Sequence, residues 1–192
     1  MFYFIFAINC AATTYCCNKA NSACFQMEKD SNMLTITITS TTKGWVGLGI
    51  GEQSMVGDIL IVWRAKDKII VSNRYGSGVP NPPKYVANSK LSVTNATQKS
   101  DSFTVIIQRP LTATNGFKTA ADGNAFYCAY KESIVADMTP ATDSLQKHDV
   151  AEHFQYAFSE ENTTTSENPS GNTSSSSKIT FCFLLAWIII VC

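Results

Sequence analysis

The chain has 192 residues, with 15 basic and 15 acidic side chains and a formal net charge of zero. That length suits one domain of ordinary size. The balanced charge gives no indication of a nucleic-acid-binding surface, and no acidic block indicates a charge-driven partner.

The first twelve residues differ from the rest. Residues 2–8 form an apolar run, and the small residues Ala11 and Ala12 follow it. This pattern is typical of a secretory signal peptide that is removed after residue 12. A buried N-terminal strand is the alternative interpretation.

The middle of the chain, residues 13–160, predicts β-structure. Residues 33–40, MLTITITS, alternate strictly between apolar and polar, as in a half-buried antiparallel strand. Residues 58–64 and 68–74 predict a hairpin about AKDK. Further strands are expected at 45–50, 102–110, 124–131 and 153–159, with a turn-rich loop at 76–84. No helical period persists, so we expect an all-β, antiparallel β-sandwich of the immunoglobulin-like type.

The end of the chain resembles a membrane-anchoring signal. Residues 161–178 are rich in Ser and Thr and predict a flexible stalk. Residues 179–192 are an apolar tail, shorter than the roughly 20 residues of a membrane span. A polar spacer followed by such a tail indicates a GPI-anchor signal with attachment near Ser170, Gly171 or Asn172. A tail-anchored helix is the alternative.

The cysteines and sequons agree with secretion. Of the seven cysteines, Cys10 would leave with the signal peptide and Cys182 and Cys192 with the tail. Because a bond between adjacent cysteines is strained, we expect Cys16 and Cys17 to pair with Cys24 and Cys128, in either order. Glycosylation sequons start at Asn95, Asn162 and Asn172.

One methionine stands out. Residues 44–63, GWVGLGIGEQSMVGDILIVW, place Met55 in a Gly-rich bend between two expected strands. A lone methionine is usually a core residue. Together with IIVSNRYGSGVPNPP and LQKHDVAEHF, however, this stretch resembles the DOMON family, and more closely the haem-b cytochrome domain of fungal cellobiose dehydrogenase. The resemblance covers about residues 24–158.

The resemblance implies that Met55 and His148 are the two axial ligands of haem b. His148 is preferred to His153 because it precedes the aromatic Phe154 by six residues, as in the family pattern. Where a glycine is common between that histidine and aromatic, this chain has Glu152.

Other residues are weaker candidates for a haem pocket formed by loops at one end of the sandwich. Three glycines would leave room for a flat ring, four aromatic residues would form walls, and two residues would meet the haem propionates. These are Gly47, Gly49 and Gly51; Trp45, Phe126, Tyr127 and Tyr130; and Arg74 and Tyr75.

We therefore expect an extracellular haem-b electron-transfer module, tethered at the plasma membrane or cell wall, and an electron-transfer protein rather than a catalyst. Since no dinucleotide-binding fingerprint is present, it would need a separate redox partner: an extracellular oxidoreductase, a copper oxygenase or a membrane reductase. The alternative is a non-haem DOMON binding or adhesion module for a carbohydrate or another ligand. A zinc site is not expected, because two histidines and oxidised cysteines offer too few ligands.

Overall fold

The computed structural model describes residues 13–30, 32–50, 56–66, 68–78, 82–87, 90–111, 125–133, 139 and 145–158. All of them belong to the first of two units into which the chain divides, Met1–Glu161 and Asn162–Cys192. The predicted signal peptide, stalk and tail lie outside the described residues. Within the described ranges, no helix is long and apolar enough to cross a membrane.

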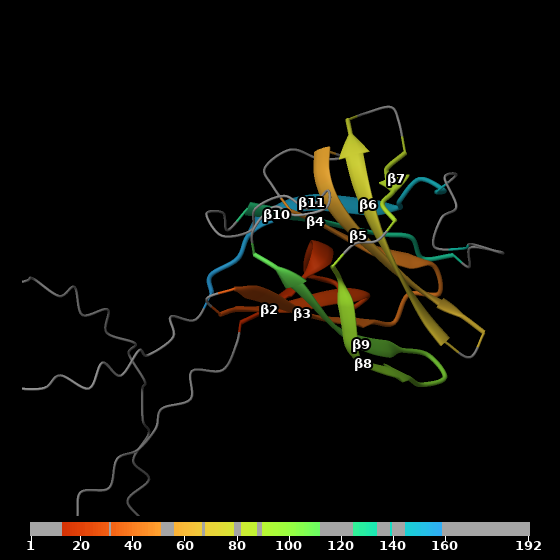
Figure 1. Ribbon diagram of the computed structural model, residues 1–192. Coiled ribbons are helices and arrows are strands. Elements are labelled where there is room, and N and C mark those ends of the chain that lie inside the picture. The colour runs from red at the N-terminus through yellow and green to blue at the C-terminus, as the bar shows by residue number, and fades with distance from the viewer. Residues whose placement is uncertain are drawn as a thin grey trace, which may run out of the picture. The chain divides into compact units, whose positions relative to one another are not determined.

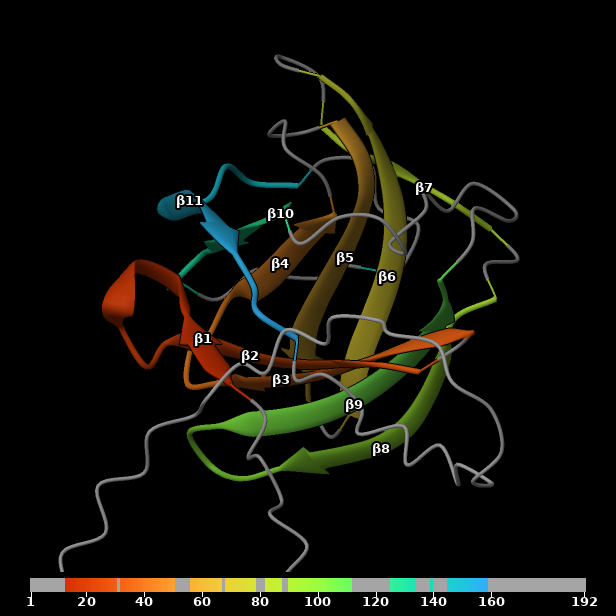
Figure 2. The same ribbon diagram turned by 90° about the vertical axis from the view of Figure 1, so that its left-hand side faces the viewer.

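Two antiparallel sheets form the domain, one above the other in Figure 1 and seen from another side in Figure 2. The five-stranded sheet has the order β1-β2-β3-β9-β8, and the six-stranded sheet has the order β11-β10-β4-β5-β6-β7. The prediction of an antiparallel β-sandwich is confirmed. The elements are β1 Thr14–Cys16, the 3₁₀ turn η1 Cys17–Lys19, β2 Ala23–Lys29, β3 Met33–Ser40, β4 Trp45–Ile50, β5 Val56–Ala65, β6 Lys68–Ser77, β7 Lys84–Tyr85, β8 Ser92–Gln98, β9 Phe103–Pro110, β10 Ala125–Tyr130 and β11 Val150–Gln155.

The main core lies between the two sheets. Strand β3 turns Leu34, Ile36 and Ile38 inward, and each of these side chains is fully buried. Successive residues of a strand face opposite sides, so the threonines between them face outward. Strand β9 contributes Phe103, Val105 and Ile107 in the same way. Each buried aliphatic side chain contributes about 1.5–3 kcal/mol to folding.

A buried ion pair accompanies this core. Arg109 Nη2 lies 2.8 Å from Asp58 Oδ2, and both side chains are 0% exposed. Burial lowers the pKa of the Arg109 guanidinium, and the Asp58 carboxylate acts in the opposite direction. The pair joins β9 of one sheet to the start of β5 in the other, since Asp58 lies two residues after Val56.

Two disulfides settle the cysteine order that the sequence left open. Cys16 bonds Cys24, its register partner across β1 and β2. Cys17 bonds Cys128 and thereby joins η1 to β10, across 111 positions of the sequence. The N-terminal segment is therefore covalently attached to both sheets.

Four strands, β1, β2, β7 and β8, were not predicted, and β5 and β11 begin earlier than expected. Strand β8 is exposed at every position, so it carries no apolar alternation to find. Strands β1 and β2 were missed as well, although β2 buries Ala23, Phe25 and Met27 in alternation. Strand β11 starts at Val150 instead of His153, because residues 150–155 all pair with β10.

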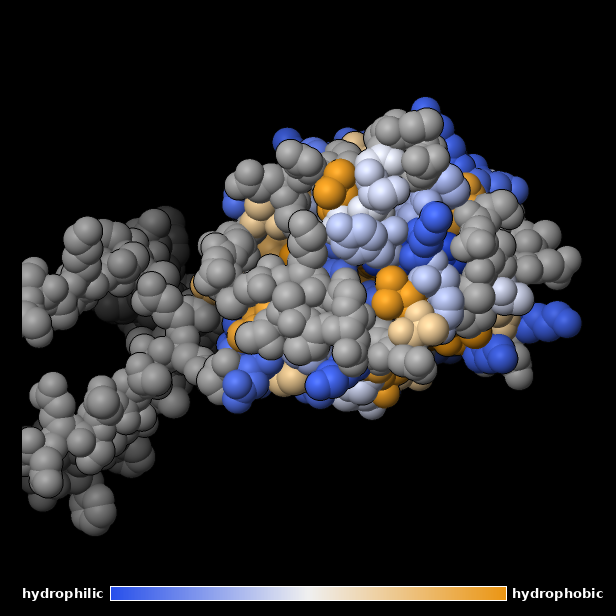
Figure 3. Space-filling view, turned by 45° about the horizontal axis from the view of Figure 1, so that its top comes forward, coloured by the Kyte–Doolittle hydropathy of each residue, from blue (hydrophilic) through white to orange (hydrophobic). Residues whose placement is uncertain are grey.

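Large apolar side chains reach the surface singly. Among the described residues, the exposed ones are Tyr75, Tyr85 and Val93. On the face seen in Figure 3, hydrophobic residues are scattered between hydrophilic ones. Such scattered exposure of the described residues is normal for a protein surface.

Candidate functional site

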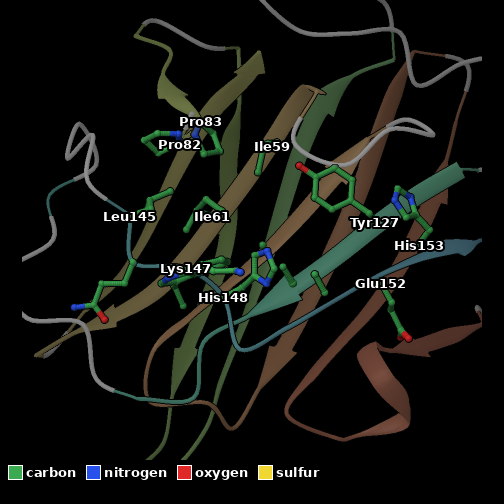
Figure 4. Close-up of a pocket in the computed structure, with 15 residues that line it drawn as sticks. Ile59, Ile61, Pro82, Pro83, Tyr127, Leu145, Lys147, His148, Glu152 and His153 are labelled. Atoms are coloured by element: carbon green, nitrogen blue, oxygen red, sulfur yellow. The ribbon is translucent and has the colours of Figure 1, made fainter. Parts of the chain in front are cut away.

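A cavity of about 510 Å³ lies on the outer face of the six-stranded sheet, on the side opposite the main core. Strands β4, β5, β10 and β11 form its floor, and residues 82–83 and 145–148 form its rim (Figure 4). The sequence predicted a pocket formed by loops at one end of the sandwich, whereas this cavity lies mainly on strands of one sheet. The lining residues are Trp45, Gly47, Ile59, Ile61, Pro82, Pro83, Tyr127, Ala129, Leu145, Gln146, Lys147, His148, Ala151, Glu152 and His153.

The floor of the cavity is apolar because the sheet is apolar on both faces. Strand β5 is buried from Gly57 to Trp63. Its even-numbered side chains enter the main core, whereas Ile59, Ile61 and Trp63 form a second cluster with Trp45 and Tyr127 on the cavity side. A continuous apolar run of this kind is typical of a strand covered on both faces. The run at residues 59–63 is thus a sequence signal for the cavity that went unused.

Gly47 keeps the floor flat beside Trp45. A Cβ atom at Gly47 would lie 3.0 Å from Ile61 Cδ1 and 3.2 Å from Trp45 Cζ3. The Nε1–H group of Trp45 is buried and has no hydrogen-bond partner among the described residues. A buried donor of this kind calls for an explanation, such as an acceptor on a bound molecule.

Gly49 behaves differently from the prediction. A Cβ atom there would lie 1.8 Å from Tyr127 Cε1, so the space above Gly49 is filled by the Tyr127 ring. It is not left free for a flat ring. Gly51 lies outside the described residues.

The four aromatic residues predicted to form pocket walls do not all face the same side of the sheet. Trp45 and Tyr127 line the cavity. Phe126 and Tyr130 point to the other face of the sheet and belong to the main core. The prediction is therefore wrong for Phe126 and Tyr130.

His148 lies at the rim of the cavity, two residues before β11, and its side chain is half-buried. Figure 4 shows its imidazole over the floor strands, with Ile61 on one side and Tyr127 on the other. Burial lowers the pKa of His148, Lys147 lowers it further, and Asp149 raises it. The neutral imidazole, which has a free lone pair for a metal ion, is thereby favoured.

His153 also lines the cavity, but it is exposed and lies within β11. Its ring is 5.8 Å from the ring of Tyr127, its register partner on β10. Both histidines are thus near the cavity, and His148 is the more enclosed of the two.

The residue after His148 is fixed to the end of β10. Asp149 accepts hydrogen bonds from the backbone N–H of Glu132 at 2.8 Å and from Lys131 Nζ at 3.2 Å. Its own backbone N–H donates to Tyr130 O at 2.9 Å. The hydrogen bond from the Glu132 backbone N–H and the bond from the Lys131 ammonium hold the pKa of Asp149 below its usual range. These contacts place the backbone of His148 firmly against the sheet.

Met55 lies outside the described residues. The strands on either side of residues 51–55 both reach the cavity: β4 contributes Gly47, and β5 contributes Ile59. Residues 51–55, which include Met55, therefore connect two floor strands in the sequence.

Arg74 and Tyr75 lie on opposite faces of β6. Arg74 pairs in register with Ile59, on the cavity side, and is fully buried. Its guanidinium donates to Ser72 Oγ and to the carbonyl oxygen of Pro83, a residue of the cavity rim. Tyr75 pairs in register with Asp58 and is 40% exposed. Only Arg74 shares a face with the cavity.

Glu152 points away from the cavity, toward the N-terminal segment (Figure 4). One of its oxygens lies 4.0 Å from Cys128 Sγ. Cys17, Cys128 and Glu152 have the spacing of a metal site. Since both cysteines are in a disulfide, neither offers a thiolate, and the cluster holds no metal in this oxidised state.

The sequons are described only in part. Asn95 is exposed on β8, at the edge of the five-stranded sheet. Asn162 and the region Ser170, Gly171 and Asn172 lie outside the described residues.

Comparison with known proteins gives one family and one fold. A family model described as the cytochrome domain of cellobiose dehydrogenase matches residues 18–168. The cytochrome b domain of pyranose dehydrogenase from Coprinopsis cinerea is 14% identical with a TM-score of 0.58, covering 71% of this chain and 76% of that chain. The cytochrome domain of Myriococcum thermophilum cellobiose dehydrogenase is 13% identical with a TM-score of 0.57, covering 76% of this chain and 82% of that chain. No match was found among curated protein sequences.

Proposed function

Because the chain belongs to the family of cellobiose dehydrogenase cytochrome domains, we propose that its cavity binds haem b and that the protein is an extracellular electron-transfer module. The axial ligands in this proposal are His148 and Met55. The observation that carries it is the half-buried imidazole of His148 at the rim of an apolar cavity on the outer face of a sheet.

The cavity fits the group. Its volume, about 510 Å³, is within the range of about 300–1,000 Å³ for cofactor and ligand sites. Gly47 leaves a flat apolar floor, and Trp45 offers a buried N–H group with no partner among the described residues. When bound, haem supplies an iron that cycles between two oxidation states, and a Met/His ligand pair raises its reduction potential.

The chain's own residues have separable roles in this proposal. His148 would offer an imidazole lone pair to the iron, and Met55 would offer a soft thioether that suits ferrous iron. An iron held by both residues would favour electron transfer over reaction with oxygen. Ile59 and Ile61 exclude water from the floor. Arg74 is buried on the cavity side of β6, behind the rim residue Pro83, and its positive charge would complement the haem propionates.

Secretion and tethering are part of the proposal. Two disulfides support an oxidising compartment, where such bonds persist. The signal peptide at 1–12, the stalk at 161–178 and the GPI-signal tail at 179–192 would then place the domain at the cell surface. A separate redox partner would exchange electrons with it.

The test is the absorption spectrum of the full chain, expressed through a secretory pathway, before and after dithionite. A Soret band that shifts on reduction, with sharp α and β bands, is expected for six-coordinate low-spin haem. His148→Ala and Met55→Ala should each convert the spectrum to a high-spin form. His153→Ala, at the other histidine of the cavity, is the contrasting variant and should keep the low-spin form.

Haem binding has a second readout. Trp45 lines the cavity, so haem should quench tryptophan fluorescence as it is titrated into haem-free protein. Protein that stays colourless and unquenched after haem is added would contradict the proposal. It would favour the alternative, a DOMON module that binds a carbohydrate or another ligand.

A further inference from the structure

The N-terminal segment packs against β11, the strand that follows His148. The Tyr15 ring stacks on the Phe154 ring, with centroids 3.7 Å apart and planes 4° from parallel. Further along, Tyr156 donates its hydroxyl proton to the carbonyl oxygen of Thr13. Residues 13–18 therefore lie along the last described residues of the domain.

Glu152 is the polar centre of this contact. Its Oε1 atom accepts a hydrogen bond of 2.5 Å from the Tyr15 hydroxyl and another from the backbone N–H of Asn18. Asn18 has a φ of +52°, a conformation that asparagine tolerates better than most residues. In this conformation its backbone N–H contacts the Glu152 carboxylate. Burial and the bond to Glu152 raise the pKa of the Tyr15 hydroxyl, so it remains a donor at neutral pH. We call Tyr15, Asn18 and Glu152 the N-terminal clasp.

A disulfide reinforces the clasp. Cys17 lies between Tyr15 and Asn18 and bonds Cys128, the register partner of Glu152 on β10. At this register position, the disulfide attaches the N-terminal segment to β10, and the Glu152 carboxylate attaches it to β11.

The clasp compensates for a weakness of β11. This strand lies at the edge of the six-stranded sheet, with β10 as its partner in the ladder. An edge strand is supported by hydrogen bonds on one side. Along β11 the side chains alternate, so Glu152 reaches the N-terminal segment while Ala151 and His153 face the cavity.

We propose that the N-terminal clasp positions His148 by holding β11 in place, with Glu152 as the main positioning residue. This inference rests on the proposed role of His148 as a haem ligand. Asp149 fixes the strand's entry to the end of β10, and Glu152 fixes its middle to the N-terminal segment. His148 lies one residue before the Asp149 anchor and four residues before Glu152, so loosening of β11 at Glu152 leaves His148 with the Asp149 anchor alone. The Glu152 carboxylate points away from the cavity, so Glu152 acts through the strand.

The first test needs no haem. Hydrogen exchange is measured on the haem-free full chain, for amides 148–155, in Glu152→Ala, Glu152→Gln and Tyr15→Phe. Losing bonds to a charged group should speed exchange in Glu152→Ala by roughly tenfold to a hundredfold. Glu152→Gln keeps an acceptor oxygen and should remain near the wild-type rate. Asp101→Ala removes an exposed carboxylate far along the chain and serves as the matched control.

The second test asks whether the ligand moves. In haem-loaded protein, Glu152→Ala should show a larger high-spin fraction and a shifted midpoint potential, while Glu152→Gln should restore both. Tyr15→Phe keeps the ring stack on Phe154 and should give a smaller shift in the same direction. Because this variant removes one oxygen atom only, it also keeps the test valid where Glu152→Ala folds poorly.

The outcomes separate the two proposals. Faster exchange without any haem binding would leave the clasp in place and contradict the proposed function. Bound haem with an unchanged spectrum and potential in both Glu152→Ala and Tyr15→Phe would overturn the clasp's role in positioning His148. Unchanged exchange in Glu152→Ala would overturn the clasp itself.

Discussion

Replacing Arg109 with methionine tests the buried ion pair that joins β9 to the start of β5. The Arg109–Asp58 contact is 2.8 Å long, and neither side chain is exposed. Arg109→Met keeps a similar apolar length but leaves the Asp58 carboxylate without its cationic partner. Breaking a buried pair in this way costs about 3–5 kcal/mol.

That cost is large for a domain of this size. Typical domains are stable by about 5–15 kcal/mol, so Arg109→Met should remove roughly a fifth or more of the free energy of unfolding. At roughly 2–4 °C per kcal/mol, the melting temperature should fall by about 6–20 °C.

The assay is urea unfolding of the haem-free chain, followed by circular dichroism, for Arg109→Met, Asp58→Leu and the double variant. Replacing both partners with apolar residues removes both buried charges, so the double variant should be more stable than either single variant. Coupling of this kind between two side chains is what a double-mutant cycle measures. A loss below about 1 kcal/mol in Arg109→Met, or strictly additive losses in the double variant, would refute the reasoning.

Three further predictions concern single side chains. Gly49→Ala should cost about 1–3 kcal/mol, because the new Cβ would lie 1.8 Å from Tyr127 Cε1; adding Tyr127→Ala should recover part of that loss in thermal melts and change the haem affinity. Tyr156→Phe should cost about 1–3 kcal/mol, since Tyr156 Oη accepts the backbone N–H of Met27 at 2.8 Å; Tyr85→Phe, at an exposed tyrosine, is the control. Backbone N–H groups of Asn32 and Met33 lower the pKa of Asp30 in the folded state, so its contribution to stability is present above the unfolded-state pKa and is lost as the pH falls through the folded value. Asp30→Asn should therefore flatten the decline in unfolding free energy below about pH 4, and an unchanged acid slope would contradict this.

The sequence predicts those strands of the sandwich that have one buried face and one solvent-exposed face. The alternation of Leu34, Ile36 and Ile38 locates β3 from end to end, because burial on one side imposes a period of two. Strand β8, Ser92–Gln98, has no buried side and therefore shows no period. Its pairing with β9 depends on backbone hydrogen bonds, which leave little trace in side-chain composition.

The candidate site is less predictable than the fold. His148 was found through a family pattern, and Trp45 and Tyr127 were found as aromatics on expected strands. Pro82, Pro83 and Leu145 reach the cavity from irregular segments far apart in the sequence, so no local period relates them. Phe126 and Tyr127 are adjacent aromatic residues, and only the register of β10 decides which of them faces the cavity.

The separation of the cavity from the main core has a consequence for the order of assembly. The residues between the two sheets form one cluster, and the cavity floor belongs to another on the far side of the six-stranded sheet. The sandwich can therefore close before any cofactor arrives, and loading becomes a late step on a finished scaffold. Substitutions on the outer cluster can abolish or remodel the site while the inner cluster keeps the chain folded. A scaffold arranged in this way can exchange one ligand chemistry for another over evolutionary time without passing through an unfolded intermediate.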